Sequence, residues 1–418
     1  MNSFRLIIII ILLSFISANK ILIPMDLNQT DHLKAYGIVF WNLQKDREVD
    51  WLLNYRGGSF MMDSYESIKS ECLIRGVKFE SINANQYAEI LATISDNNMD
   101  IALLETVPKI AVYSPPGKQP WDDAVTLALT YAEVDYDVIF DQEVLTGGLK
   151  KYDWLHLHHE DFTGQYGKFY KNYRNRSWYK KMESDFNQTA NQFGFNSVHN
   201  LKKSIATEIK SYVTQGGFLF AMCSATDSYD IALSAVNVDI VHSVFDGTPI
   251  DSDYQKKLNF NNTFAFENFQ LYPDPMIYEY STIDTPPSHK PIARGAEEDY
   301  FSLFEFSAKW DPVPTMLTQN HVGIVKGFMG QTTAFDRNHI KDHVVILGEV
   351  EGTSIVKYIH SNIGKGSFTF LGGHDPEDYR HMVGDPATDL SLHRNSPGYR
   401  LILNNILFPS ARKKDRKT

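Results

Sequence analysis

The sequence that decides the fold is residues 216–226, which read GGFLFAMCSAT. Two glycines end a helical pattern, and an unbroken apolar run then leads directly into Cys223. The small residues Ala221 and Ala225 stand two positions to each side of the cysteine. A sharp turn from a strand into a helix needs small neighbours there, because larger side chains would clash across it. The segment therefore predicts a buried strand, a tight turn that carries Cys223, and a helix.

Strands and helices alternate around this segment. We expect strands at residues 109–113, 136–140, 152–157, 218–222, 343–347 and 367–371. We expect helices at residues 121–134, 201–214 and 399–407. Strands that alternate with helices of this length form right-handed βαβ units with a parallel sheet. The sequence thus predicts an α/β fold, a flavodoxin-like parallel sheet with helices on both faces.

The length of 418 residues leaves room for more than one compact unit. Residues 19–107 have their own strand and helix pattern, typical of a small α/β module. Residues 108–409 form the main domain, with long insertions at about 162–200 and 236–300. The first insertion is aromatic and mostly basic, and we interpret it as a lid, a contact for an anionic ligand, or a solvated helical insertion. Residues 410–418 form a basic tail that we expect to be disordered.

The first eighteen residues have the pattern of a signal peptide. Arg5 supplies a positive charge, residues 6–13 are apolar, and residues 14–18 supply the small side chains of Ser14, Ser17 and Ala18. The apolar run is too short to span a bilayer comfortably, and no second run of spanning length follows. We therefore expect an exported protein, periplasmic or extracellular, with no membrane span after signal removal. A retained N-terminal anchor is the alternative.

The composition argues against one class of partner. The formal net charge is −11, so the phosphates of nucleic acids would repel the chain. Hydrophobic residues make up 43% and charged residues 22%, which is ordinary for a soluble globular protein. We expect the partner to be a small-molecule or carbohydrate substrate and not a nucleic acid.

Cys223 is a candidate nucleophile. The predicted turn would point its sulfur out of the sheet and bring the backbone N–H of Ser224 close to it. Such N–H groups lower a thiol pKa and stabilise a developing oxyanion. The only other cysteine, Cys72, lies in a helical pattern and reads as a small buried residue. The alternative for Cys223 is an ordinary buried strand residue.

A second segment, residues 364–377, reads GKGSFTFLGGHDPE and places His374 directly after a predicted strand. Ligands in α/β sheets gather at the carboxyl ends of strands, where both Cys223 and His374 would lie. A cysteine and a histidine can act as nucleophile and base, with Asp375 or Glu377 orienting the imidazole. His374 as a simple helix cap is the alternative.

A third segment, residues 155–161, reads LHLHHED. His156 and His158 would share one face of a strand, about 7 Å apart. Imidazoles at this spacing can bind a divalent metal, with Glu160 as third ligand. The alternatives are that His156, His158, His159, Glu160 and Asp161 face a substrate, or that they make structural hydrogen bonds. No other cofactor is expected.

The strand order, the cysteine turn and the late Gly-Lys-Gly…Gly-His-Asp pattern together resemble the class I glutamine amidotransferase-like superfamily. The closing motif is similar to its trehalose-utilisation (ThuA-like) branch. The resemblance covers residues 108–409 and implies Cys223 as nucleophile, His374 as base and the Ser224 N–H in an oxyanion hole. The chain departs from the family in having alanine instead of glycine around Cys223 and no His-x-Glu pair.

The whole chain also resembles exported bacterial proteins labelled asparagine synthetase B. A synthetase of that kind needs an N-terminal cysteine nucleophile, but residue 2 is Asn. It also needs a Ser-Gly-Gly-x-Asp-Ser loop, and residues 224–228 lack both glycines. The motifs therefore do not support synthetase chemistry.

Three functional hypotheses remain. The first is an exported hydrolase or amidase that uses Cys223 and His374. The second is a metal-dependent hydrolase centred on His156, His158 and Glu160. The third is a non-catalytic carbohydrate- or partner-binding protein on the same fold.

Overall fold

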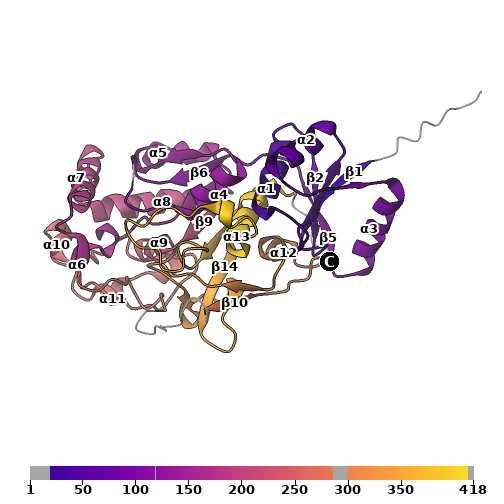
Figure 1. Ribbon diagram of the computed structural model, residues 1–418. Helices are drawn as coiled ribbons and strands as arrows, with labels where there is room; N and C mark the ends of the chain where they lie inside the picture. Colours follow the sequence, from indigo (N-terminus) through magenta and orange to yellow (C-terminus); the bar gives the residue numbers. More distant parts are fainter. Residues whose placement is uncertain (1–18, 118, 286–298, 413–418) are drawn as a thin grey trace, which may run out of the picture.

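Five parallel strands form one half of the main sheet. The computed structural model describes residues 19–117, 119–285 and 299–412 (Figure 1). Within these residues the main sheet has ten strands, in the order β11-β10-β13-β14-β15-β9-β8-β6-β7, with β12 beside β14. The parallel strands are β6 (Ile110–Tyr113), β7 (Asp137–Ile139), β8 (Trp154–Leu157), β9 (Phe218–Met222) and β15 (Gly366–Leu371). Numbered along the chain, their spatial order is 2-1-3-4-5, the flavodoxin-like order that the sequence predicts.

The other half of the sheet is antiparallel, which the sequence reasoning missed. It consists of β10 (Tyr300–Leu303), β11 (Ile324–Lys326), β12 (Phe335–Asp336), β13 (Val345–Glu349) and β14 (Ile355–Ile363). A tight turn at Gly364, which has a φ of 60°, joins β14 to β15 in a hairpin. The chain is therefore α/β with a mixed sheet, and its parallel part carries the strand ends where a site is expected.

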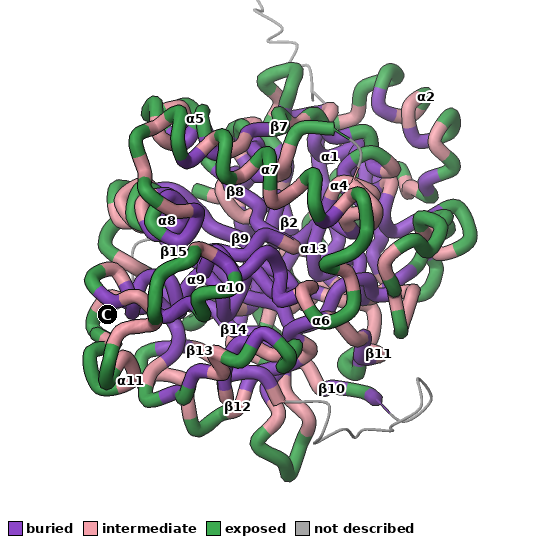
Figure 2. Tube along the Cα trace, turned by 90° about the vertical axis from the view of Figure 1, so that its left-hand side faces the viewer, coloured by how far each residue is buried: buried purple, intermediate pink, exposed green. Residues whose placement is uncertain are grey.

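Helices cover both faces of the parallel strands. Side chains alternate along β9, so that Phe218, Phe220 and Met222 enter one core while Leu219 and Ala221 enter the other. The first core includes α4 (Ala124–Ala132) and α13 (Pro397–Leu407), and the second includes α8 (Val198–Gln215) and α9 (Ser224–Ser234). Figure 2 shows the resulting buried centre, with exposed residues on the outer helices and loops.

The N-terminal module contains an antiparallel sheet. In the described part of the chain its five strands have the order β4-β1-β3-β2-β5. They are β1 (Lys20–Ile23), β2 (Val49–Leu53), β3 (Ser59–Asp63), β4 (Glu80–Ile82) and β5 (Asp100–Leu104). Its helices are α1 (His32–Leu43), α2 (Glu66–Arg75) and α3 (Ala84–Asp96). The sequence pattern of residues 19–107 predicted a small α/β module but did not reveal β3 and β5.

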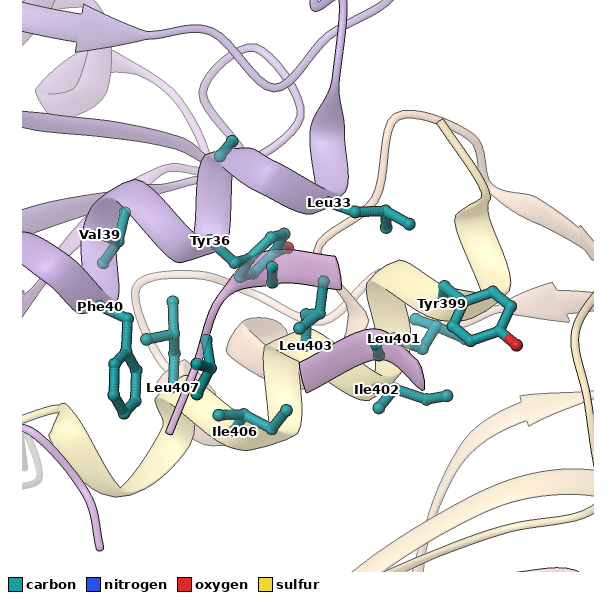
Figure 3. Packing of buried hydrophobic residues seen from close by; sticks show 14 of the residues in the cluster. Leu33, Tyr36, Val39, Phe40, Tyr399, Leu401, Ile402, Leu403, Ile406 and Leu407 are labelled. Atoms are coloured by element: carbon teal, nitrogen blue, oxygen red, sulfur yellow. The ribbon is translucent and has the colours of Figure 1, made fainter. Parts of the chain in front are cut away.

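The module and the main domain share one core. Helix α1 packs on α13 through Leu33, Tyr36 and Phe40 on one side and Leu403 and Leu407 on the other (Figure 3). These side chains are at most 2% exposed. The boundary predicted near residue 107 is thus a change of sheet, while the hydrophobic core continues across it.

The two insertions are mostly short helices and loops. They contain α6 (Tyr170–Tyr173), α7 (Ser177–Gln192), α10 (Ser243–Asp246) and α11 (Tyr254–Lys257), while α5 (Asp141–Leu145) and α12 (Pro312–Thr318) lie elsewhere in the main domain.

The predicted signal peptide, residues 286–298 and residues 413–418 of the basic tail lie outside the described residues. The disorder predicted for residues 410–412 is wrong, because Ala411 pairs with Leu104 of β5. Among the described helices, none is both long and apolar enough to cross a bilayer.

Candidate functional site

The predicted turn between β9 and α9 is present, and Cys223 has a strained backbone there. Its φ is 50° and its ψ is −138°, a combination that non-glycine residues adopt only where surrounding contacts enforce it. The Cys223 N–H donates to the carbonyl of Gly373 at 3.2 Å, and the Thr226 hydroxyl donates to the Cys223 carbonyl at 2.7 Å. These contacts fix the cysteine at the carboxyl end of its strand.

The Cys223 thiol is buried and protonated at neutral pH. The residue is 3% exposed, and its sulfur accepts a hydrogen bond from the backbone N–H of Gln331 at 3.3 Å. Burial raises the pKa of the thiol to about 11, although backbone N–H groups of Gln331, Thr332 and Ser224 oppose this shift. The Ser224 N–H therefore lies where the sequence predicted, but the thiol is not activated.

His374 lies at the carboxyl end of β15, as predicted, without the predicted partners. Among the described residues, neither of its ring nitrogens has a hydrogen-bond partner, so it forms no pair with Cys223. Asp375 accepts hydrogen bonds from the hydroxyls of Tyr399 and Thr388, at 2.9 and 2.8 Å. Glu377 pairs with His393 at 3.0 Å. The prediction that Asp375 or Glu377 orients His374 is wrong, because both carboxylates have other partners.

Three histidines meet where β8 and β15 end. The ring centroids of His158 and His159 are 3.9 Å apart, and those of His374 are 4.6 and 4.4 Å from them. One potential ligand atom from each of the three lies within 4.8 Å of the others. Burial, the largest cause, and the neighbouring histidines hold the pKa values of His159 and His374 well below the usual range, so both rings are neutral. This group has the composition and spacing to hold a metal ion.

Two of the three imidazoles have partners that favour a ligating tautomer. His158 Nδ1 lies 3.2 Å from a carboxylate oxygen of Asp123, and His159 Nε2 lies 2.7 Å from the backbone carbonyl of Asp122. An N–H that faces an oxygen leaves the other ring nitrogen with a lone pair for a metal. Within the described ranges neither ring nitrogen of buried His158 makes a hydrogen bond, so its Nδ1 contact with Asp123 is a close ion-pair distance.

Of the predicted metal ligands, His156 and His158 lie together, and Glu160 does not join them. One ring nitrogen of each histidine and a carboxylate oxygen of Asp123 lie within 4.8 Å of one another, so Asp123 takes the place predicted for Glu160 in a second group that could hold a metal ion. His156 is fully buried, with Nδ1 at 3.2 Å from the Phe220 carbonyl and Nε2 at 3.2 Å from Asp123. Glu160 accepts from the backbone N–H of His158 at 3.2 Å, and burial raises its pKa to about 7. Strand β8 ends at Leu157, so the chain turns and His159 also lies beside His158.

Asp161 has a structural role instead of the predicted contact with substrate. Its carboxylate accepts hydrogen bonds from the backbone N–H groups of Thr163, Gln165 and Gly167 at 2.7, 2.7 and 3.0 Å. It therefore organises the loop after β8. Of the five residues predicted to contact substrate, only His159 lines the cavity described next.

A cavity of about 530 Å³ lies beside the histidines and Cys223. His159, His374, His381, Cys223 and Ser224 are among the residues that line it. Other lining residues form an aromatic wall, Trp121, Phe169, Tyr173 and Tyr278, and a polar group, Asp299, Lys357 and Tyr379. The cavity is therefore a mixed apolar and polar site of small-molecule size.

The insertion at residues 162–200 contributes to the cavity wall. Its Phe169 packs on Trp121, with ring centroids 5.5 Å apart, and on Tyr278 at 6.2 Å. Lys168 is 1% exposed and donates to the backbone carbonyls of Tyr272 and Asp274. The segment thus lies against the site, and this lysine holds two loops together instead of facing a ligand.

Several residues of the site were not assigned from sequence. Asp122 and Asp123 fall within the helix predicted for residues 121–134, and no role at the site was predicted for them. His381 stacks on His374, with centroids 4.2 Å apart. Asp122 and Asp378 overcome burial and raise the pKa of His381 to about 9. Asp122, Asp123 and His381 contact residues that are distant in the sequence. The only sequence signal for them is therefore the frequent histidine and aspartate after strand ends.

Comparisons with known proteins leave the function open. No family model and no curated protein matches the chain. Similar solved structures include the cytoplasmic protein STM3548 from Salmonella typhimurium, at 10% identity over 73% of this chain and 100% of that chain, with a TM-score of 0.34. The cytoplasmic protein STM1381 from Salmonella typhimurium LT2 is 12% identical with the same coverage and a TM-score of 0.33. A β-galactosidase from Bacillus circulans sp. alkalophilus is 10% identical over 66% of this chain and 29% of that chain, with a TM-score of 0.26. At these scores the likenesses carry no argument about function, and the glutamine amidotransferase-like resemblance stays a prediction.

Proposed function

We propose that this protein is a metal-dependent hydrolase that holds a divalent transition-metal ion with His158, His159 and His374. The supporting observation is the convergence of three imidazoles beside a cavity, with buried ring nitrogens of His158 and His374 that have no hydrogen-bond partner in the described part of the chain. Buried polar atoms are normally paired, so such nitrogens require an explanation. A bound metal ion supplies one.

The donor set fits such an ion. Imidazole nitrogens suit Zn²⁺ and similar metals, and a site with three protein ligands leaves a position open for water or substrate. A divalent ion held in this way supplies Lewis-acid chemistry for hydrolysis. His159 and His374 line the cavity, so the open position would face it.

The chain's own residues suit a small substrate with an apolar and a polar part. The aromatic wall of Trp121, Phe169, Tyr173 and Tyr278 would contact the apolar part. Lys357 and Asp299 also line the cavity, with Lys357 Nζ 3.4 Å from Asp299 and both side chains less than 10% exposed. This buried pair would bind a polar group and orient the substrate.

Zinc binding tests the proposal directly. We expect the metal-depleted protein to bind one equivalent of Zn²⁺, measured by calorimetry and by elemental analysis after dialysis. His374→Ala should lose this binding, because one of three ligands is removed. His343→Ala is the matched control, since His343 is exposed and lies outside the cluster. Absence of Zn²⁺ binding, or equal binding by His374→Ala, would refute the proposal.

A cysteine-dependent hydrolase is the second candidate, favoured by the strained backbone of Cys223. Rates of alkylation by iodoacetamide at several pH values separate the two candidates. We expect slow alkylation that His374→Ala does not change, because the thiol is buried and protonated. Fast alkylation with an apparent pKa well below about 8.5, slowed by His374→Ala, would favour the cysteine mechanism.

A further inference from the structure

We infer that Asp123 is a positioning residue that fixes the orientation and tautomer of His158. The inference rests on the metal-dependent function proposed above. It concerns a residue outside the ligand set, because Asp123 would act on the metal only through the imidazole that it holds.

Asp123 makes contacts with both carboxylate oxygens. It is the N-cap of α4, where Oδ1 accepts a hydrogen bond from the Thr126 N–H at 2.9 Å. Oδ2 lies 3.2 Å from His156 Nε2 and 3.2 Å from His158 Nδ1. The cap anchors the carboxylate to the start of a helix, so Oδ2 faces the two imidazoles in a fixed direction.

This arrangement decides which nitrogen of His158 can bind a metal. Asp123 Oδ2 lies 3.2 Å from Nδ1 without forming a hydrogen bond in this structure, and its negative charge would attract a hydrogen to Nδ1 and so leave Nε2 with a lone pair. His158 is 1% exposed, so water does not compete for either nitrogen. Carboxylates that hold metal-binding histidines in this way raise ligand basicity, and their removal typically weakens metal binding by about 10–100-fold.

His156 supports the carboxylate from the other side. Its Nδ1 lies 3.2 Å from the Phe220 carbonyl in the neighbouring strand β9, and its Nε2 meets the same Asp123 oxygen as His158 does. A neutral imidazole has one N–H and can donate to only one of these two oxygens, so His156 supports the carboxylate mainly by filling the space between Asp123 and β9. This gives the fully buried His156, predicted as a ligand, a role in holding the site.

Asp31 provides a matched control. It is the N-cap of α1, where Oδ1 accepts from the Lys34 N–H at 2.9 Å. Its other oxygen accepts from the Tyr131 hydroxyl at 2.7 Å, and within the described residues it makes no ion pair with a histidine. Asp31→Asn thus repeats the chemical change of Asp123→Asn at a helix start without the imidazoles. Asparagine is a good N-cap, so neither variant removes the cap.

The first test is the affinity for Zn²⁺, measured by competition with a chelator. Relative to the wild type, we expect Asp123→Asn to bind about 10–100-fold more weakly and Asp31→Asn to bind equally. Equal affinity of Asp123→Asn and wild type would overturn the inference while leaving the proposed function intact. Absence of Zn²⁺ binding by the wild type would instead refute the proposed function. In that case the NMR measurement of the His158 tautomer decides whether Asp123 positions His158.

The second test reads the tautomer of His158 in the metal-free wild-type protein by long-range ¹H–¹⁵N NMR. We expect hydrogen on Nδ1 and a lone pair on Nε2, and a loss of this single tautomer in Asp123→Asn. A merely structural role of Asp123 would not change the tautomer. If the wild-type spectrum shows the hydrogen of His158 on Nε2, the inference is overturned. This spectrum is recorded without metal and on the wild type, so it does not depend on whether Asp123→Asn folds.

Discussion

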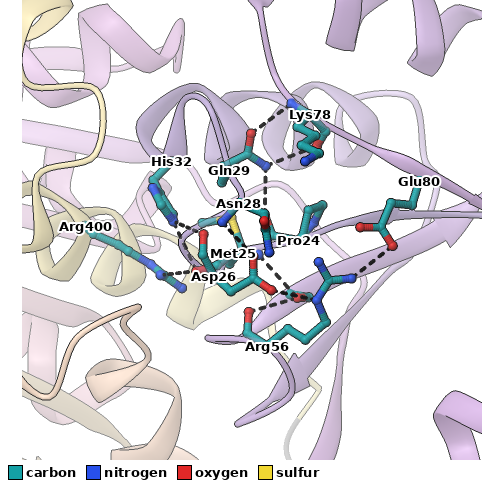
Figure 4. A network of polar contacts seen from close by, with 11 residues as sticks. Pro24, Met25, Asp26, Asn28, Gln29, His32, Arg56, Lys78, Glu80 and Arg400 are labelled. Carbon is teal, nitrogen blue, oxygen red and sulfur yellow. Dashed lines mark hydrogen bonds and ion pairs between the residues drawn. The ribbon is translucent and has the colours of Figure 1, made fainter.

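The stacked histidines His32 and His321 should make folding stability sensitive to acid. His32 is 1% exposed, and its ring centroid lies 4.2 Å from that of His321 at an interplanar angle of 18°. Figure 4 shows His32 at the start of α1, close to the Met25 carbonyl and to Arg400 of α13. Burial and the Arg400 guanidinium lower the pKa of His32 to about 4. Burial, His32 and Arg400 lower that of His321 to about 3.

The lowered pKa of His32 makes the folded state less stable as the pH falls. The folded-state pKa of His32 is below the unfolded value of about 6.5, so the unfolded state binds the proton first. The stability contribution is complete above about pH 6.5 and is lost as the pH falls from there towards about 4. For folded and unfolded values of about 4 and 6.5, the loss at pH 5 is about 2 kcal/mol.

The perturbation that isolates this contribution is His32→Gln. Glutamine keeps an N–H donor for the Met25 carbonyl but does not titrate. We expect the variant to be less stable than the wild type at pH 7, because it loses the stacking on His321. Between pH 7 and pH 5, however, its free energy of unfolding in urea should fall by about 2 kcal/mol less than that of the wild type.

Parallel pH profiles of wild type and His32→Gln would refute this reasoning. Other groups titrate over the same range and cancel in the difference, except His321, whose pKa His32 helps to lower, so the difference reports on the stacked pair. His343→Gln is the control for the removal of an exposed imidazole, and its profile should follow that of the wild type.

Three further changes test other parts of the structure by urea unfolding. Lys202→Met should destabilise the fold by about 3–5 kcal/mol, because Lys202 and Asp141 form a salt bridge with both side chains 1% exposed; a loss below about 1 kcal/mol would contradict this. Cys223→Gly should be more stable than Cys223→Ala by about 1 kcal/mol, because glycine adopts the positive φ of 50° without strain, and equal stabilities would argue against a strained turn. Leu403→Ala should cost about 2–5 kcal/mol and should loosen the N-terminal module, measured as faster proteolysis of that module.

The parallel half of the fold could be predicted because its strands are apolar runs. Residues 218–222 are such a run, and the small neighbours of Cys223 reveal the turn that follows. Strand β14 could not be recognised in the same way, because it carries Lys357 and His360. Both are buried, with Lys357 beside Asp299 and His360 Nδ1 at 3.0 Å from the Thr369 hydroxyl. Lys357 and His360 thus contact residues that are distant in the sequence or lie on a neighbouring strand. A single sequence does not show these contacts.

The site could be predicted as a region but not as a set of ligands. The histidines after β8 and the one after β15 were recognised, and parallel strands bring their carboxyl ends to one edge. Both His156 and His159 lie close to His158, and the sequence alone did not show that His374 and Asp123 complete the two groups. The role of Asp123 depended on a side-chain contact that its helix-start pattern does not reveal.

The pairing of residues 410–412 with β5 has a consequence for handling the protein. Strand β5 is an edge strand of the N-terminal sheet, and unpaired edges promote association between chains. The Glu105 N–H donates to the Ser410 carbonyl at 2.9 Å, and the Arg412 N–H donates to the Leu103 carbonyl at 2.8 Å. Residues 410–412 thus cover the edge of β5. Truncation at residue 409 would expose the edge of β5 and favour aggregation. A C-terminal affinity tag should therefore be added after residue 418 and should not replace residues 410–418.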